Sequence, residues 1–300
     1  MTSADGMIVV NGANGKLGRT VMARLSPERA RAGVRRHASR YVDPLIIGSD
    51  GRVAPAALVG VSAIINCAGV VQADQNSLTQ ANVEHAVELA RCARAAGVRH
   101  FVQVSSFTIY GTAETINATA PDQPITAYGR SKLQAERALA ALATPHFKPI
   151  NVRLPFMFDR EQPALIGRTI SMLTKLPFLP APPEPVRRSM MTYGDAADTL
   201  ISIAQSTSTE GMVAVADPTY FSFGGLLESM RRHQLPTPAV VAIPRSLGSA
   251  VARVAPTLAR RLLQSSMLVP EANWAALQTM RLGIAAEIEA IVAAVTCSRG

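Results

Sequence analysis

Short apolar runs alternate with amphipathic stretches of helical spacing through the first half of the chain. The apolar runs have the length and the bounding turn residues of buried strands. They occupy Met7–Asn11, Ala30–Val34, Leu45–Gly48, Ala63–Asn66, His100–Ser105 and Ile150–Leu154. The helical stretches occupy Lys16–Leu25, Leu78–Ala96 (which Gly97 closes) and Ala127–Leu142. Strands that alternate with helices predict βαβ units and therefore an α/β fold with a parallel sheet.

A glycine-rich turn follows the first predicted strand at once and opens the first predicted helix. Glycines let a backbone approach a phosphate closely, and a helix N-terminus favours an anion. The turn therefore predicts a dinucleotide site on a doubly wound Rossmann sheet, although a plain tight turn is the alternative. The residues expected to hold the pyrophosphate are Gly12, Asn14, Gly15, Lys16, Leu17 and Gly18.

Two arginines, Arg35 and Arg36, follow the second predicted strand, where an NAD site usually has a carboxylate for the ribose 2′-hydroxyl. Guanidinium groups suit a 2′-phosphate, so the pair predicts NADP and leaves NAD open. The alternative is that both are surface residues of an arginine-rich chain. Asp50, after the third strand, is expected either to accept from the adenine amino group or to serve as a turn residue.

The pattern changes after Leu154. The proline-rich segment Leu176–Pro185 predicts a loop, Met212–Ala216 a late strand of the main sheet, and the part from Ser222 onward a largely helical region. We therefore expect a dinucleotide-binding domain and a smaller, mostly helical substrate-binding lobe. The domain comprises residues 1–154, with 189–216 returning to it, and the lobe comprises 155–188 and 217–300.

Composition and charge narrow the range of partners and locations. The formal net charge is +9, but the arginines are scattered and not interleaved with aromatics, which favours small anions over nucleic acid. No stretch has the length of a membrane span, and the basic, apolar Pro244–Leu263 is expected to be a domain helix rather than a membrane-surface element. Three cysteines without a CxxC pair, and an N-terminus without a signal-peptide core, predict a reducing, cytoplasmic location.

The chain resembles the extended short-chain dehydrogenase/reductase family of the NAD-dependent epimerase/dehydratase type. The resemblance is carried by Gly12–Gly18, Ile65–Gly69, Asn82–Glu84, Ala95–Ser106, Ile109–Gly111 and Tyr128–Lys132. It implies catalysis by Ser106, Tyr128 and Lys132. In the family match, counting back along the sequence from Ile109-Tyr110-Gly111 selects Ser106 rather than Ser105. It implies cofactor contacts from Asn66, Ala68, Gly69 and Lys132. It also implies a homodimer formed through Leu78–Ala96 and Ala127–Leu142.

Tyr128 and Lys132 lie four residues apart on a predicted helix and therefore share one face. A free tyrosine has a pKa near 10, and a neighbouring ammonium is expected to lower it into a useful range. The hydroxyl of Ser106, after the fifth strand, is expected to hydrogen-bond the reacting oxygen. A Tyr-x-x-x-Lys pair on an ordinary helix surface is the alternative.

The second half is similar to the nucleotide-sugar branch of that family, in Arg187–Asp195 and in Leu263–Val269. The similarity implies that Arg188 binds the substrate diphosphate. The branch's usual Tyr-Gly-Pro is here Met157-Phe158-Asp159, which leaves the sugar open. We interpret Asn82 as structural. The histidines show no ligand spacing, so no metal site is expected.

The residues after Ser106 disfavour one reaction of the family, dehydration, and leave reduction and epimerisation. Dehydratases of the family resemble one another in an Asp-Glu pair after the active-site hydroxyl, whereas Phe107 and Thr108 follow Ser106. The favoured function is NADP-dependent reduction of a keto group on a nucleotide-sugar, with Tyr128 as the proton donor. NAD-dependent C4 epimerisation is the alternative, and reduction of another carbonyl is open. A non-catalytic dinucleotide sensor remains as a different class.

Overall fold

The computed structural model describes residues 6–35, 40–161, 164–181, 185–242, 264–273 and 283–297. The chain forms two compact units. The large unit comprises 1–111, 121–155 and 193–215, and the small unit comprises 112–120, 156–192 and 216–300. The bounds expected from the sequence differ from these units, because residues 112–120, 189–192 and 216 belong to the small unit and residue 155 belongs to the large one.

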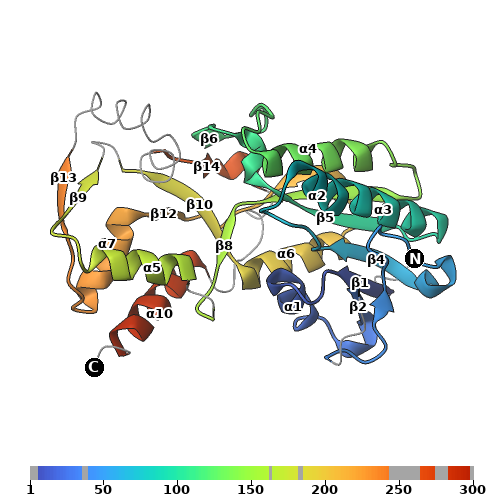
Figure 1. The fold of residues 1–300 in the computed structure, drawn as a ribbon, viewed down its shortest axis with the longest axis horizontal. Coiled ribbons are helices and arrows are strands. Elements are labelled where there is room, and N and C mark those ends of the chain that lie inside the picture. The colour runs from blue at the N-terminus through green and yellow to red at the C-terminus, as the bar shows by residue number, and fades with distance from the viewer. Residues whose placement is uncertain are drawn as a thin grey trace. The chain divides into compact units, whose positions relative to one another are not determined.

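Seven parallel strands form the central sheet of the large unit, in the order β11-β7-β5-β4-β1-β2-β3 (Figure 1). They are β1 (Met7–Asn11), β2 (Ala30–Val34), β3 (Leu45–Ile46), β4 (Val61–Asn66), β5 (His100–Ser106), β7 (Lys148–Leu154) and β11 (Gly211–Ala214). The strand order reverses at β1, so the ligand crevice of such a sheet lies beyond the carboxyl ends of β1 and β4. The predicted Rossmann-type α/β fold is confirmed, and the third strand is shorter than expected.

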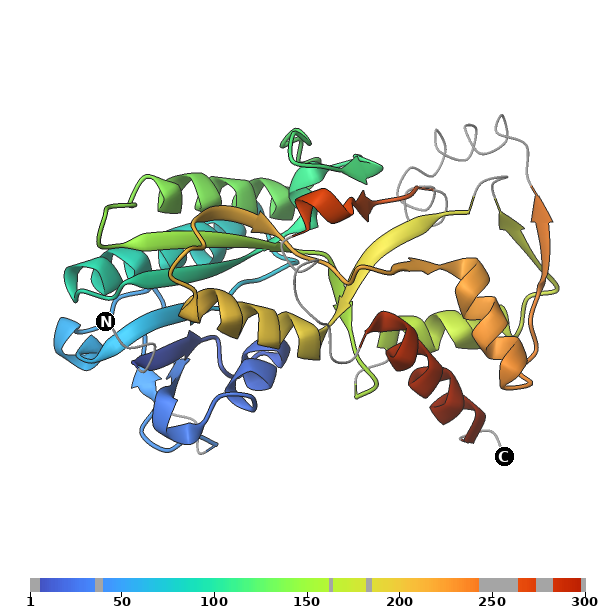
Figure 2. The ribbon, with the colours of Figure 1, turned by 180° about the vertical axis from the view of Figure 1, so that it is seen from behind.

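Helices cover both faces of this sheet. One face carries α1 (Lys16–Met22) and α6 (Tyr193–Gln205), and the other carries α2 (Gln75–Thr79), α3 (His85–Ala95) and α4 (Ala127–Ala140) (Figures 1 and 2). Asp74 caps α2 by accepting from the amide of Ser77 at 3.0 Å, and Thr126 caps α4 by accepting from the amide of Gly129 at 3.0 Å. These caps fix where each helix begins.

The predicted helix Leu78–Ala96 is interrupted by one π-helical turn, Gln80–Glu84, between α2 and α3. The inserted residue shifts the helix face locally and turns Asn82 inward, where it is buried. Such π turns occur frequently at functional sites.

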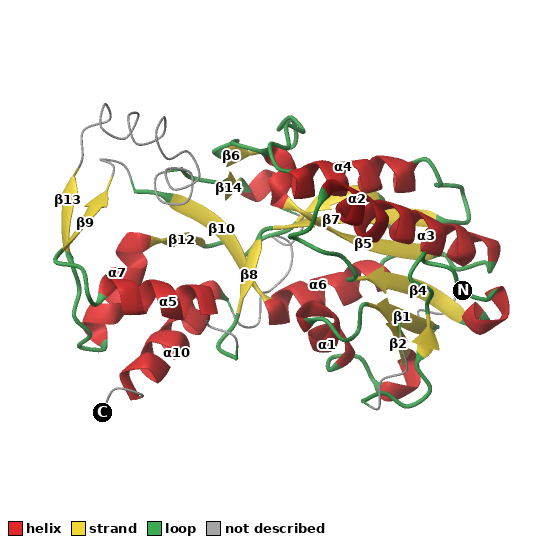
Figure 3. Cartoon of the chain, in the orientation of Figure 1, coloured by secondary structure: helices red, strands yellow, loops and turns green. Residues whose placement is uncertain are grey.

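The small unit combines three helices with three small sheets among its described residues (Figure 3). The helices are α5 (Ala164–Leu173), α7 (Phe223–Arg232) and α10 (Ile284–Cys297). The strands pair as β12 (Tyr220–Ser222), β10 (Arg187–Thr192) and β8 (Phe156–Phe158), as β13 (Ala239–Ala242) with β9 (Phe178–Ala181), and as β14 (Met267–Leu268) with β6 (Thr115–Ile116). A core that includes Ile170, Leu226, Met230 and Ile291 joins the helices to β10 and β12. The unit therefore holds more strand than its sequence pattern suggested.

Part of the proline-rich segment Leu176–Pro185 is a strand rather than a loop. Residues 178–181 pair with β13, and Pro180 is tolerated because both strands of a two-stranded sheet are edges. The segment Pro244–Leu263 lies outside the described residues. Within the part of the chain that the structure describes, no helix is long and apolar enough to cross a membrane.

Candidate active site

The glycine-rich turn after β1 forms a close-packed cradle against the ends of β2 and β4. Gly12 has a φ of +78°, and a Cβ on it would lie 2.7 Å from the backbone nitrogen of Ala68. A Cβ on Gly18 would collide with the carbonyl oxygen of Gly12. The amides of Gly12 and Ala13 donate to the carbonyl of Gly33 at 3.1 and 3.3 Å. Only glycine fits both positions, which is the geometry that close approach of a pyrophosphate requires.

The other residues of the turn differ in exposure. Asn14 and Gly15 are exposed, whereas Leu17 is buried under the sheet. Lys16 is half-buried, and its Nζ lies 5.6 Å from the ring centroid of Tyr193. Asn14 and Gly15 therefore present the outer surface of the turn, and Leu17 anchors it.

The end of β2 carries the predicted determinant of cofactor choice. Arg35 is exposed, and Arg36 lies outside the described residues. The structure brings a further residue, Tyr41, which the sequence did not single out, to the glycine-rich turn. The Tyr41 hydroxyl donates to the carbonyl of Ala13 at 2.7 Å. Burial raises the pKa of Tyr41, while Arg40 and Arg19 act to lower it. Three arginines of the described chain thus lie around the outer end of the cradle.

The three predicted catalytic residues lie together at the carboxyl end of β5. Ser106 ends β5 and accepts from the amide and the hydroxyl of Thr108 at 3.2 and 3.0 Å. Tyr128 is in the first turn of α4, close enough to Ser106 for that side chain to act on the pKa of its hydroxyl. Lys132 is buried one turn further on, with Nζ 5.7 Å from the Tyr128 ring centroid. Its ammonium donates to the carbonyl of Val104 at 3.1 Å.

Burial dominates the electrostatics of this group. It raises the pKa of Tyr128, and the hydrogen bond from Ser106 only partly opposes the rise. Burial also lowers the pKa of Lys132 to about 8 and raises the pKa of the neighbouring Cys67 thiol to about 12. The expected lowering of the Tyr128 pKa is wrong for the protein alone, because desolvation raises that pKa by more than Ser106 lowers it. Tyr128 is therefore a protonated phenol at neutral pH.

The loop after β4 is held in place from three sides. The side-chain oxygen of Asn66 accepts from the amide of Ala68 at 3.2 Å. Asn82 bonds both backbone groups of Val70 and donates to the Ser131 hydroxyl of α4 at 3.0 Å. A Cβ on Gly69 would lie 3.2 Å from the Lys132 Nζ. The interpretation of Asn82 as structural agrees with these contacts, and the loop brings Gly69 next to Lys132.

A buried ion pair that the sequence did not reveal anchors the catalytic helix to the sheet. Arg153 of β7 donates to both carboxylate oxygens of Glu136 of α4, with distances from 2.7 to 3.2 Å, and pairs with Asp122 at 2.7 Å. Burial acts to lower the pKa of Arg153, but the bonds to Glu136 and Asp122 raise it overall. The hydroxyl of Ser105 also donates to Glu136. Ser105 thus supports α4 from within β5, whereas Ser106 ends the strand and lies near Tyr128 in the first turn of the same helix.

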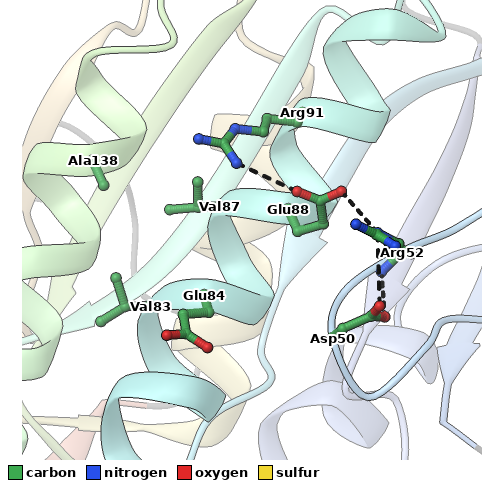
Figure 4. Close-up of a pocket in the computed structure, with 8 residues that line it drawn as sticks. All are labelled: Asp50, Arg52, Val83, Glu84, Val87, Glu88, Arg91 and Ala138. Carbon is green, nitrogen blue, oxygen red and sulfur yellow. Dashed lines mark hydrogen bonds and ion pairs between the residues drawn. The ribbon is translucent and has the colours of Figure 1, made fainter.

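Asp50 occupies a turn and a surface pocket rather than the cradle. Its carboxylate accepts from the amide of Arg52 at 3.1 Å, as a turn residue does. Figure 4 shows the pocket, which has an apolar floor between α3 and α4 and charged residues on its rim. It is lined by Asp50, Arg52, Val83, Glu84, Val87, Glu88, Arg91 and Ala138. None of the candidate catalytic residues lines it, and the adenine contact and the homodimer both stay predictions.

Arg188 lies on β10 of the small unit and is half-buried. Its Nε and one terminal nitrogen donate to the carbonyl of Gln264 at 3.2 and 3.1 Å, and burial lowers its pKa. These bonds attach the segment around Gln264 to β10. The backbone amide of Ser189 in β10 also donates to the carbonyl of Ser266 at 2.8 Å. The diphosphate role of Arg188 stays a prediction. No group of three or more His, Cys, Asp and Glu residues in the described ranges could hold a metal ion.

Several solved structures share the fold over nearly the whole chain. One is MoeE5 in complex with UDP-glucose and NAD, with a TM-score of 0.70, 18% identity, and coverage of 98% of this chain and 100% of that one. UDP-glucuronic acid 4-epimerase from Bacillus cereus in complex with NAD has a TM-score of 0.70 and 11% identity, covering 97% and 99%. RMD from Pseudomonas aeruginosa complexed with NADPH has a TM-score of 0.64 and 17% identity, covering 98% and 100%. At these identities the likeness establishes the fold.

The family is established by the sequence. No curated protein sequence matches the chain. The family model described as the NAD dependent epimerase/dehydratase family matches residues 8–206, which include the cradle, Ser106, Tyr128 and Lys132. The predicted resemblance and the prediction of an NAD(P)-dependent enzyme are thereby confirmed. The chain belongs to the NAD dependent epimerase/dehydratase family.

Proposed function

We propose that the protein is an NADP-dependent oxidoreductase that reduces a keto group on a nucleotide-sugar, with Tyr128 as the proton donor. The observation that carries the proposal is the grouping of Tyr128 and Ser106 beside the buried Lys132 at the carboxyl end of β5. Because the pKa of Tyr128 is raised, the phenol holds its proton at neutral pH and is available as an acid.

The residues have complementary roles in this reaction. The bound dinucleotide supplies a hydride to the carbonyl carbon. Tyr128 gives its phenolic proton to the carbonyl oxygen, and Ser106 orients that oxygen by a hydrogen bond. Lys132 holds an ammonium near the ring, which stabilises the phenolate that is left. It is also expected to hold the nicotinamide ribose.

The cradle fits a nicotinamide dinucleotide. Gly12 and Gly18 leave no room for a Cβ and so leave the turn open to a pyrophosphate. We assign the pyrophosphate to residues 12–18, the 2′-phosphate to Arg35 and Arg36, and the nicotinamide end to Asn66, Ala68 and Gly69. The buried side chain of Asn66 supports the last of these through the Ala68 amide.

The substrate class rests on Arg188 and on the neighbours. MoeE5 binds UDP-glucose, and the Bacillus cereus enzyme is named as acting on UDP-glucuronic acid. A guanidinium suits a diphosphate through bidentate contact. Dehydration is disfavoured, because the Phe107 ring packs edge-on against Tyr110 and the Thr108 hydroxyl is bonded to Ser106. Neither residue offers an acid or a base.

C4 epimerisation with NAD is the second candidate. It is favoured by the 4-epimerase that shares the fold at a TM-score of 0.70. An epimerase takes the hydride from the sugar and returns it to the other face, so it keeps its cofactor bound through many turnovers.

The test combines retained cofactor with turnover. The purified protein is denatured and its released ligands are identified by mass spectrometry, and NADPH oxidation is followed with 4-keto nucleotide-sugars and with a simple ketone of similar size. Reduction of a keto-sugar nucleotide at the expense of NADPH supports the proposal. Tightly retained NAD, with interconversion of two sugars and no net oxidation, supports the epimerase. Equal rates with the simple ketone would contradict the nucleotide-sugar assignment.

A further inference from the structure

A row of buried amide side chains crosses the large sheet at one register. Asn11 of β1 pairs with Asn66 of β4, Asn66 with Gln103 of β5, and Gln103 with Asn151 of β7. Each is at most 3% exposed, although the residues around them in these strands are mainly apolar. Burying an amide is costly unless its polar atoms are bonded. The row therefore calls for a role besides packing.

Hydrogen bonds run continuously along three members of the row. Asn11 Nδ2 donates to Asn66 Oδ1 at 2.8 Å, and Asn66 Nδ2 donates to Gln103 Oε1 at 2.7 Å. Gln103 Nε2 then donates to the carbonyl of Val104 at 3.1 Å. Asn66 and Gln103 thus each accept from the preceding member of the row and donate onward, and the last bond ends on the Val104 carbonyl of β5 itself.

His85 fixes this direction at the start of the row. Its Nδ1 lies 3.3 Å from the carbonyl of Ser49, which can only accept, so Nδ1 carries the proton. Burial lowers the pKa of His85 and keeps the ring neutral, so Nε2 is an acceptor for Asn11 Nδ2 at 2.9 Å. A flipped Asn11 would set its oxygen against the Nε2 lone pair. The neutral His85 ring therefore fixes which way the Asn11 amide faces, and the hydrogen bonds of the row fix the Asn66 and Gln103 amides in turn.

The far end of the row meets the catalytic lysine. The carbonyl of Val104 accepts from Gln103 Nε2 and from Lys132 Nζ, both at 3.1 Å. Two donors on one carbonyl compete for its electron density, and the positive end of the amide N–H lies near the ammonium. Both effects disfavour the charged form of Lys132.

We propose that Gln103 is a positioning residue for Lys132, held in a single orientation by the row that starts at His85. The inference rests on the proposed function only in giving Lys132 a catalytic role. The titratable groups near Lys132 are Cys67, Glu136 and Tyr128, and those near His85 are Arg35 and Asp50. None of these belongs to the amide row, so replacing Gln103 leaves their charges in place.

The chain suits a direct test because it has only four lysines: Lys16, Lys132, Lys148 and Lys175. Protein labelled with 13C at the lysine Cε carbons is titrated by NMR without cofactor or substrate. The Lys132 resonance is identified by its loss in Lys132→Met. We expect Gln103→Leu to raise the pKa of Lys132 by about half to one unit, from the loss of one competing hydrogen bond. Gln103→Glu keeps the size of the side chain and an acceptor for Asn66, and its carboxylate should raise that pKa further.

Asn151→Leu is the matched control. Asn151 is a buried amide at the same register, but it donates to the carbonyl of Glu136 at 3.3 Å rather than to Val104. Its replacement should leave the Lys132 pKa unchanged. An unchanged pKa in both Gln103 variants, or an equal shift in Asn151→Leu, would overturn the inference. The titration needs no turnover, so a shift in the Gln103 variants supports the inference even if the proposed reaction fails.

Discussion

Lys132 places a positive charge in the interior of the large unit, and replacing it with methionine should stabilise the fold. Burial lowers the pKa of Lys132 from 10.5 to about 8. That difference corresponds to roughly 3 kcal/mol of unfolding free energy lost whenever the lysine is charged. The variant also gives up the hydrogen bond to Val104, worth about 1 kcal/mol. We therefore expect Lys132→Met to be more stable than the unmodified protein by about 2 kcal/mol at pH 7.

The pH dependence of this stability difference tests whether the buried charge of Lys132 causes it. The folded pKa lies below the unfolded one, so the unfolded chain binds more protons between pH 8 and 10.5, and the unmodified protein gains stability over that window. The advantage of Lys132→Met, measured by urea unfolding, should fall by about 2 kcal/mol between pH 7 and 9.5. Lys148→Met, which removes a surface partner of Glu210, is the control for the loss of a lysine outside this buried position and is measured at the same two pH values. A constant advantage, or a variant less stable at pH 7, would refute the reasoning.

Four further predictions concern the reaction. Tyr128→Phe removes the acid and keeps the ring, so NADPH binding by calorimetry should persist while turnover falls by about a hundred- to ten-thousand-fold; undiminished turnover would refute the mechanism. Turnover should decline as the pH rises through about 8, where Lys132 loses its proton, and a profile flat to pH 10 would contradict its charged role. Calorimetry should show NADPH bound more tightly than NADH, with Arg35→Ala reducing the preference more than Arg36→Ala; equal binding in the unmodified protein would remove the NADP assignment. Arg188→Ala should raise KM for a nucleotide-sugar and leave NADPH binding intact, and an unchanged KM would remove its diphosphate role.

The sheet could be predicted from the sequence because parallel strands buried on both faces leave an unambiguous apolar pattern. Met7–Asn11 and Ala30–Val34 have the predicted bounds. The small unit was harder, because a two-stranded sheet needs no long apolar run. β9 contains Pro180, which reads locally as a loop signal, and only its pairing with β13 makes it a strand.

Some features of the candidate site follow from the local sequence, and others depend on contacts between distant segments. Tyr128 and Lys132 are four residues apart, so helical periodicity alone puts them on one face. Their pKa shifts depend on burial by segments that the local sequence does not reveal. The amide row likewise joins Asn11 to Gln103, which lie 92 residues apart in the sequence, and it does so only through strand register.

The two buried cations beside α4 show how the choice between lysine and arginine follows from function. Arg153 is enclosed by Glu136 and Asp122, which keep it charged, and a permanent guanidinium suits a structural anchor. Lys132 lies against the carbonyl of Val104 and the thiol of Cys67, and its pKa falls to about 8. Only four of the thirty Lys and Arg residues are lysines, and one of them occupies this buried position, where its charge is lost as the pH rises through about 8. An arginine at that position would keep its charge as the pH rises, so Lys132→Arg should lose the alkaline limb of the pH profile, and a limb that persists in the variant would contradict the charged role of Lys132.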